Sequence, residues 1–317
     1  MRTLRFGGVA LLLAGLLACG GGGGGGNPAG GGTARDYERT ESEPAVLPNG
    51  SGGFTASRVV TISNDDAGAS RAVVSLAVPN GSLNSSPGSS GYQIQVTLSA
   101  EGDTEQEARA KLASMSVAHR DGVGGDTLYL QNEIELAPVA NGENRIATVT
   151  ATLPAALSYE LYQSVENLGP VGSSGLSGTL ARIEGENASA NLSGTWDEAT
   201  VYSSNLGVTV SGDVASLQAA SNNGTVQASI PGTRNAVAIL DSSNGNVDAT
   251  VGRTLGTVFD LEASTDNGAA TIVVAGTQPV GAQAPNQAHF RSTDYATGSP
   301  KVRVIARTDN LNASIHD

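Results

Sequence analysis

Polar and apolar residues alternate in a fixed register after a series of asparagines in the second half of the chain. The third and fifth residues after each of six asparagines are apolar, and the residues between them are mostly polar. This pattern predicts strands with one buried face. These six asparagines are Asn187, Asn205, Asn223, Asn244, Asn267 and Asn310, and Asn167 precedes them as a further marker of the repeat. The steps from Asn167 to Asn267 are 18 to 23 residues long. A weaker marker, Asn286, divides the longer interval between Asn267 and Asn310.

A glycine marks a second corner seven to nine residues after most of these asparagines, and another apolar strand leads back to the next one. A repeat near twenty residues with short strands and polar corners is typical of a solenoid. We therefore predict that residues 164–317 form a parallel β-solenoid (β-helix) of about seven or eight coils, at about 4.8 Å per coil. Residues 278–300 depart from the repeat and are expected to form one coil with a protruding loop. The alternative is an antiparallel β-sandwich with Asn-Gly hairpins, which would not be expected to keep this register.

The corner residues are expected to be structural. Asparagine and glycine tolerate a positive φ, which other residues adopt only at a cost. Stacked asparagine amides could also form a hydrogen-bonded ladder along the corner. The predicted corner residues are Asn187, Asn205, Asn223, Gly224, Asn244, Gly245, Asn267, Gly268 and Asn310.

Residues 54–163 are predicted to form a small β-rich unit that precedes the solenoid. Five segments have the apolar alternation of strands, and "PNG" at 79–81 indicates a turn. One helix is expected over residues 104–115. Thr104 and Glu107 have the spacing of a capping box, and Glu105 and Arg109 can pair one helical turn apart.

The N-terminus has the pattern of a secretion signal. A short cationic segment (1–6) precedes about a dozen apolar residues, too few to span a bilayer as a helix. The sequence "LLAC" at 16–19 resembles the lipobox of bacterial lipoproteins. This resemblance implies that residues 1–19 are a lipoprotein signal peptide and that Cys19 receives a lipid anchor. An ordinary cleaved signal with a chance cysteine is the alternative.

The composition favours a thin core and an extracytoplasmic protein without disulfides. Residues 20–53 are rich in glycine and are expected to be a disordered tether. The chain is 39% hydrophobic but only 4% aromatic, and Cys19 is its only cysteine. Its formal charge of −13 argues against nucleic acid as a partner.

The order of several motifs is similar to that of a family of bacterial envelope proteins with adhesin-like domains of unknown function. The matching stretches are "VSLAVPNGSL" (74–83), "EGDTEQEARAKLASMSV" (101–117), "TATLPAALSYEL" (150–161) and the "SSNG"-type corners that follow. The resemblance covers about residues 70–317 and implies a β-solenoid at the cell envelope. "ENLGPVG" (166–172) and the 278–300 segment depart from the pattern.

Few residues point to catalysis. Polysaccharide-active β-helices need clustered acids, bases or histidines on one exposed sheet, whereas the outward positions here are mainly Ser, Thr, Asn and Gln. The acidic residues at corners or on strands could bind Ca²⁺, but capping of their own turns is the simpler expectation, and we predict no metal and no cofactor. These residues are Asp241, Asp248, Asp260, Asp266 and Asp309.

Aromatic and basic residues gather in one place outside the repeat. His289, Phe290, Arg291 and Tyr295 lie in the irregular segment and are the first candidates for a partner contact, although covering a coil edge is the simpler role. Trp196 could stack on a sugar or fill a gap in the stack, and the second role is favoured.

We therefore expect a non-catalytic, lipid-anchored envelope protein, on the outer membrane if the host is Gram-negative, that offers a surface to carbohydrate or to an envelope protein. The alternatives are a polysaccharide-active β-helix enzyme and an envelope-stress sensor or scaffold.

Overall fold

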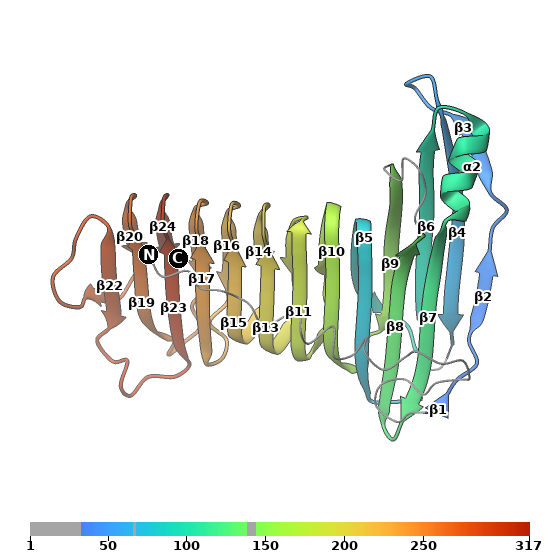
Figure 1. Cartoon of the computed structure of the whole chain (residues 1–317). Helices are drawn as coiled ribbons and strands as arrows, with labels where there is room; N and C mark the ends of the chain where they lie inside the picture. Colours follow the sequence, from blue (N-terminus) through green and yellow to red (C-terminus); the bar gives the residue numbers. More distant parts are fainter. Residues whose placement is uncertain (1–32, 66–67, 138–143) are drawn as a thin grey trace.

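The computed structural model describes residues 33–65, 68–137 and 144–317. These residues form a mostly β structure with one short helix, a large and mostly parallel sheet, and a small β-rich unit at its N-terminal end (Figure 1). The all-β class agrees with the prediction. No helix of the described residues is long and apolar enough to cross a membrane. The predicted signal peptide and Cys19 lie outside the described residues.

The N-terminal unit consists mainly of antiparallel pairs. β4 pairs with β2, β3 and β6, β6 pairs with β9, and β7 pairs with β1 and β8. β5 joins this unit to the rest of the sheet, because it pairs in parallel with β8 and β9 on one side and with β10 on the other. The elements are β1 (Thr33–Ala34), β2 (Glu38–Glu41), β3 (Ala45–Pro48), β4 (Phe54–Asn64), β5 (Arg71–Gly88), β6 (Tyr92–Gly102), α2 (Glu105–Ala113), β7 (Met115–Gly124), β8 (Thr127–Leu136) and β9 (Arg145–Pro154).

The helix α2 lies within the predicted range and begins as predicted. The hydroxyl of its N-cap residue, Thr104, accepts a hydrogen bond from the backbone N–H of Glu107, which satisfies one of the free donors of the first turn. Arg109 pairs with Glu105 at 2.8 Å, one helical turn apart. The helix buries Ala108 and Leu112 against β6 and β4. Met115, the last residue of the predicted range 104–115, is the first residue of β7 instead.

From β10 onward the chain repeats one unit, which we call a rung: a long strand, an asparagine corner and a short strand. Long strands pair in parallel with long strands and short strands with short strands, in register. Hairpins are antiparallel, so this pairing is not that of the sandwich alternative. The strands are β10 (Ser158–Ser173), β11 (Ser177–Asn187), β12 (Ala190–Leu192), β13 (Thr195–Ser203), β14 (Val208–Val210), β15 (Asp213–Ser221), β16 (Val226–Ile230), β17 (Ala236–Ser242) and β18 (Val247–Val251).

The last rung of the sequence is not the last rung in space. β23 lies between β17 and β19, and β24 lies between β18 and β20, so the C-terminal segment is inserted between two rungs that precede it in the chain (Figure 1). The remaining strands are β19 (Val258–Thr265), β20 (Ala270–Val273), β21 (Thr277–Pro279), β22 (Gln287–Ser292), β23 (Lys301–Thr308) and β24 (Ala313–His316).

Charge complementarity accounts for the position of the inserted rung. Arg307 on β23 faces Asp241 on β17, and Arg303 faces Asp260 on β19. Without β23, the same register would place Glu262 opposite Ile239, diagonal to Asp241, with no cation between β17 and β19. Opposite charges on facing strands stabilise a pairing and like charges disfavour it.

Residues 278–300 do not form a coil, in contrast to the expectation. Within them β22 pairs antiparallel with β19, and β21 pairs antiparallel with β22. This hairpin covers the free edge of the outermost long strand, which would otherwise expose unpaired backbone groups. The segment departs from the repeat because it covers the edge of the stack rather than adding a rung.

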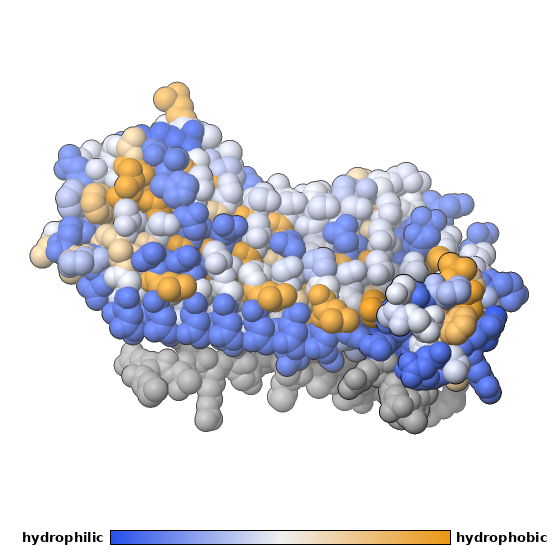
Figure 2. Space-filling view, turned by 90° about the horizontal axis from the view of Figure 1, so that it is seen from above, coloured by the Kyte–Doolittle hydropathy of each residue, from blue (hydrophilic) through white to orange (hydrophobic). Residues whose placement is uncertain are grey.

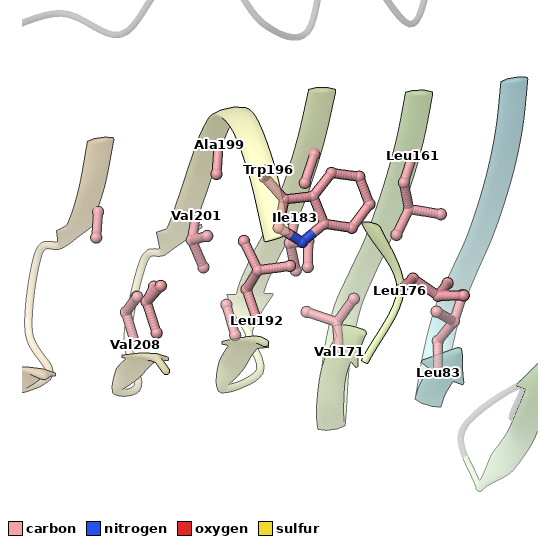
Figure 3. Close-up of a cluster of buried hydrophobic side chains, with 14 of the residues drawn as sticks. Leu83, Leu161, Val171, Leu176, Ile183, Leu192, Trp196, Ala199, Val201 and Val208 are labelled. Carbon is pink, nitrogen blue, oxygen red and sulfur yellow. The ribbon is translucent and has the colours of Figure 1, made fainter. Parts of the chain in front are cut away.

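The core is the space between the long and the short strands. Small and branched apolar residues fill most of it, and Trp196 is its largest fully buried side chain. Figure 3 shows the indole of Trp196 among Leu161, Val171, Leu176 and Ile183. Two residues earlier, the positive φ of Gly194 (117°) allows the tight second corner before Trp196.

Three neighbouring polar residues in the N-terminal unit, Tyr92, His119 and Asp121, are expected to make the stability of the protein depend on pH. Tyr92 donates a hydrogen bond to Asp121 at 2.6 Å, and His119 lies beside them, with its Nε2 3.4 Å from the Tyr92 hydroxyl. Burial, and to a smaller extent the charge of Arg39, lower the pKa of His119 from 6.5 to about 4. Burial raises the pKa of Asp121, although the Tyr92 hydrogen bond opposes this shift.

Lowering the pH from about 6.5 to about 4 is expected to destabilise the protein through His119. In this window the unfolded chain binds a proton at His119 that the folded chain does not, so the free energy of unfolding decreases as the pH falls. Urea unfolding of the wild type and of His119→Gln across this range measures the effect. The destabilisation of the wild type relative to the variant should grow toward pH 4; a constant difference would contradict the prediction.

Candidate functional site

The predicted corner asparagines form one column along the stack. In the spatial order 167, 187, 205, 223, 244, 310, 267, each asparagine after the first donates its Nδ2 to the Oδ1 of the one before it, at 2.5 to 3.0 Å. Figure 2, which looks onto these corners, shows hydrophilic residues in a continuous row. Several amides also donate to a backbone carbonyl of the neighbouring rung, as Asn223 and Asn310 do. Because these donors are used within the stack, the column is better suited to holding rungs in register than to binding a ligand.

A second, buried column of hydroxyl groups runs beside the asparagines. Each hydroxyl is two residues before a corner asparagine and donates to a backbone carbonyl of the neighbouring rung at 2.7 to 2.9 Å. In the same corner it accepts a backbone N–H three residues later, as Ser242 does from Gly245. Sequence reasoning missed this column, although a serine or threonine two residues before the asparagine is visible in five repeats. The residues are Ser203, Ser221, Ser242, Thr308 and Thr265.

The prediction that these corner residues adopt a positive φ is wrong, whereas the predicted ladder of asparagine amides is present. Within the described residues, none of the column asparagines has a positive φ, and neither Gly224 nor Gly245 does. Close stacking requires these glycines instead: a Cβ on Gly245 would lie 2.0 Å from the carbonyl oxygen of Gly224. Gly224 and Gly268 meet the carbonyl of a neighbouring rung in the same way.

Of the predicted contact residues, Trp196 is not available to a partner and Phe290 is half-buried. Trp196 is fully buried, so it fills the stack and cannot stack on a sugar. Phe290 packs against the hydrophobic core, because it lies on the opposite side of β22 from its neighbours His289 and Arg291. Alternation along a strand explains both outcomes.

The other predicted contact residues do come together, at the C-terminal end of the stack. His289 and Arg291 lie on the outward face of β22, beside acidic and basic residues of the neighbouring strands β19 and β23. The cross-strand pairs are His289 with Glu262, Arg291 with Asp260, and Asp260 with Arg303. We call this group the Asp260 cluster: Asp260, Glu262, His289, Arg291, Tyr295, Lys301 and Arg303.

A buried carboxylate is at the centre of this cluster. Arg291 donates from its guanidinium to both oxygens of Asp260, at 3.0 and 3.1 Å. His289 Nε2 lies 2.8 Å from the same carboxylate, Arg303 Nε lies 4.0 Å from it, and Arg303 also contacts Glu262 at 3.0 Å. Asp260, on β19, therefore holds side chains from both neighbouring strands, β22 and β23.

The protonation of the cluster follows from these contacts. Burial alone would raise the pKa of Asp260, but the hydrogen bonds from Arg291 and His289 hold it below its usual value. The same contact raises the pKa of Arg291. Asp260, Glu262 and His289 could together ligate a metal ion, since their ligand atoms lie within 4.8 Å of one another. A metal would have to displace Arg291 from Asp260, so the arrangement is better described as an ion-pair network.

Similarity searches give a few distant structural matches. No family model and no curated protein matches the chain. A candidate cell adhesion protein from Clostridium sporogenes is 11% identical with a TM-score of 0.34, covering 88% of this chain and 99% of that chain. A candidate adhesin from Bacteroides fragilis is 12% identical with a TM-score of 0.37, covering 81% and 96%. A candidate lipid-binding protein from Parabacteroides distasonis is 12% identical with a TM-score of 0.30, covering 81% and 96%.

Proposed function

We propose that this protein is a non-catalytic, adhesin-like lipoprotein of the bacterial cell envelope. In this proposal a β-solenoid rod, tethered through the glycine-rich segment that follows a lipid-anchored Cys19, presents a binding or scaffold surface. One observation carries it: the in-register column of seven asparagines, which indicates a long, stiff body built by repetition rather than around a catalytic cleft. Such bodies commonly offer extended surfaces to partners.

The binding surface is assigned to the outward face of the long strands, with the Asp260 cluster at its end. Exposed positions on this face, such as Ser216 and Gln218, are polar and uncharged. The cluster differs from the rest of the face because three cationic side chains and a tyrosine gather beside a buried carboxylate. A carbohydrate or an envelope protein suits such a face, and the charge of −13 argues against nucleic acid.

The alternative is a polysaccharide-active enzyme, which the contact between Asp260 and His289 favours as a candidate acid–base pair. Incubating the purified protein with a panel of envelope glycans, and measuring both retention and release of new reducing ends, separates the two functions. We expect saturable binding without turnover. Turnover that is lost in His289→Ala would contradict the proposal and support the enzyme.

The anchor is tested in cells. The wild-type protein should incorporate a palmitate analogue and remain with membranes after a high-salt wash, whereas Cys19→Ala should do neither, because the thiol is the acylated group. Labelling of Cys19→Ala to the wild-type level would overturn the anchored model. A lipid-free protein that still binds glycans would leave the binding function intact.

A further inference from the structure

The Asp260 cluster has its cationic groups at the surface and its central carboxylate beneath them. The side chains of Arg291 and Arg303 are 43% and 44% exposed, whereas that of Asp260 is 7% exposed. Lys301 is also exposed. A ligand approaching this face therefore meets two guanidinium groups and an ammonium group before it meets Asp260.

Both guanidinium groups retain hydrogen-bonding capacity. A guanidinium carries five N–H donors, and the contact of Arg291 with Asp260 uses its Nε and Nη2. Arg303 donates from Nη2 to Glu262. The contact with Asp260 also fixes the orientation of Arg291, so little side-chain entropy is lost when a ligand binds.

An aromatic ring lies between two of the cations. The guanidinium carbon of Arg291 is 5.4 Å from the ring centre of Tyr295, and Lys301 Nζ is 5.7 Å from it. Both distances are in the range of cation–π contacts, which hold the cations in place without neutralising their charge. Arg291, Arg303 and Lys301 outnumber the carboxylates of Asp260 and Glu262, giving a local excess of one positive charge, without counting His289, in a chain of net charge −13.

The face that leads away from the cluster suits a chain of sugar rings. In the register of the parallel strands, the row next to Arg303 begins at the buried Ile305 and continues with Ile239, Gln218 and Thr200, which are at least partly exposed. Each of these side chains lies on the next strand of the sheet, and neighbouring strands are about 4.8 Å apart. The row therefore combines apolar contact with hydroxyl and amide groups. Sugars present apolar ring faces and hydroxyls, so the row complements a saccharide better than it complements a lone phosphate.

We propose that the Asp260 cluster binds the carboxylate of an acidic saccharide, with Arg291 and Arg303 as the charge-recognising residues and Lys301 beside them. The inference rests on the proposed binding function and names its ligand class. The excess of one charge fits a sparsely charged saccharide, because the acidic body would repel a dense polyanion.

Isothermal titration of the full protein with a sugar trimer that carries one galacturonic acid residue tests this assignment. Its methyl ester, which has the same sugars without the charge, and inorganic phosphate are the comparison ligands. We expect the acid trimer to bind at least about tenfold more tightly than either, and Arg291→Gln to lose about tenfold, as is typical for one charge-assisted hydrogen bond. Arg182→Gln is the matched control, because Arg182 also lies over a tyrosine, Tyr162, at 6.0 Å but outside the cluster.

Lys301→Gln provides a second variant if Arg291→Gln fails to fold, since Lys301 does not contact Asp260 in the ion-pair network. Equal binding of the acid and the ester, equal binding of phosphate, or unchanged affinity in both cluster variants would overturn the assignment. Absence of binding to the trimer together with retention of a neutral glycan would reject the inference and leave the proposed binding function standing. Absence of any glycan or protein binding would reject the proposed function itself.

Discussion

Replacing Trp196 by alanine is expected to lower the free energy of unfolding by about 3–5 kcal/mol. The indole is fully buried between the long and short strands, among smaller side chains that include Leu161, Val171 and Ile183. The backbone around it is held in register by parallel pairing on both sides, so the stack cannot collapse around the cavity. Urea unfolding, followed by far-ultraviolet circular dichroism, measures the loss.

Trp196→Phe is the control for this prediction, because phenylalanine fills part of the same space. It should lose clearly less stability than Trp196→Ala. If the free energy of unfolding of Trp196→Ala were within about 1 kcal/mol of the wild-type value, Trp196 would not fill this part of the core. The packing described for the stack would then be wrong.

Replacing Gly245 by alanine is expected to lower the free energy of unfolding by about 1–3 kcal/mol, the usual cost of overpacking. The added Cβ would lie 2.0 Å from the Gly224 carbonyl oxygen and 2.8 Å from the Ser242 hydroxyl, so two adjacent rungs would have to move apart. The Ser242 hydroxyl, which links these rungs through Gly224, would be disturbed as well.

Gly207→Ala is the matched control. Gly207 occupies a corner of the same kind, but a Cβ there would meet only the Thr225 carbonyl oxygen, at 3.2 Å. Thermal unfolding of both variants measures the difference, and Gly207→Ala should be clearly more stable than Gly245→Ala. Equal losses in the two variants would show that glycine is required at these corners for backbone flexibility, rather than for close approach of the rungs.

Local features of this fold were predictable because each depends on neighbouring residues. The alternation after each marker asparagine identified the buried faces, and the residues around Thr104 identified the start of α2. The single tryptophan in a chain poor in aromatics was expected to fill a gap, which it does. The predicted division of the chain at residue 163 remains a prediction, while the parallel pairing extends back to β5. The prediction that residues 20–53 are a disordered tether is wrong for β1, β2 and β3, which pair with β7 and β4 and belong to the N-terminal unit.

The order of the rungs could not be predicted from the repeat. All rungs offer similar inward residues, such as Leu240, Leu261 and Val304, so burial does not discriminate between their positions. The order depends on charges that meet only after folding, with Arg303 and Arg307 between acidic strands. For the same reason Asp260 could not be recognised as the centre of a cluster, since its partners come from segments about 30 and 40 residues away. A charged residue on an otherwise polar strand is a weak signal without that pairing.

Disulfide trapping tests the central claim, that the rungs stack in parallel and that the C-terminal rung lies between two earlier ones. In a Cys19→Ala background, cysteines would replace Asn244 and Asn310 in one variant, and Asn244 and Asn267 in another. Neighbouring strands are about 4.8 Å apart, within the Cα separation that a disulfide can bridge, whereas twice that distance exceeds the limit of about 7 Å. The account predicts that the 244–310 pair cross-links on mild oxidation and that the 244–267 pair does not; cross-linking of 244 to 267 instead would contradict it.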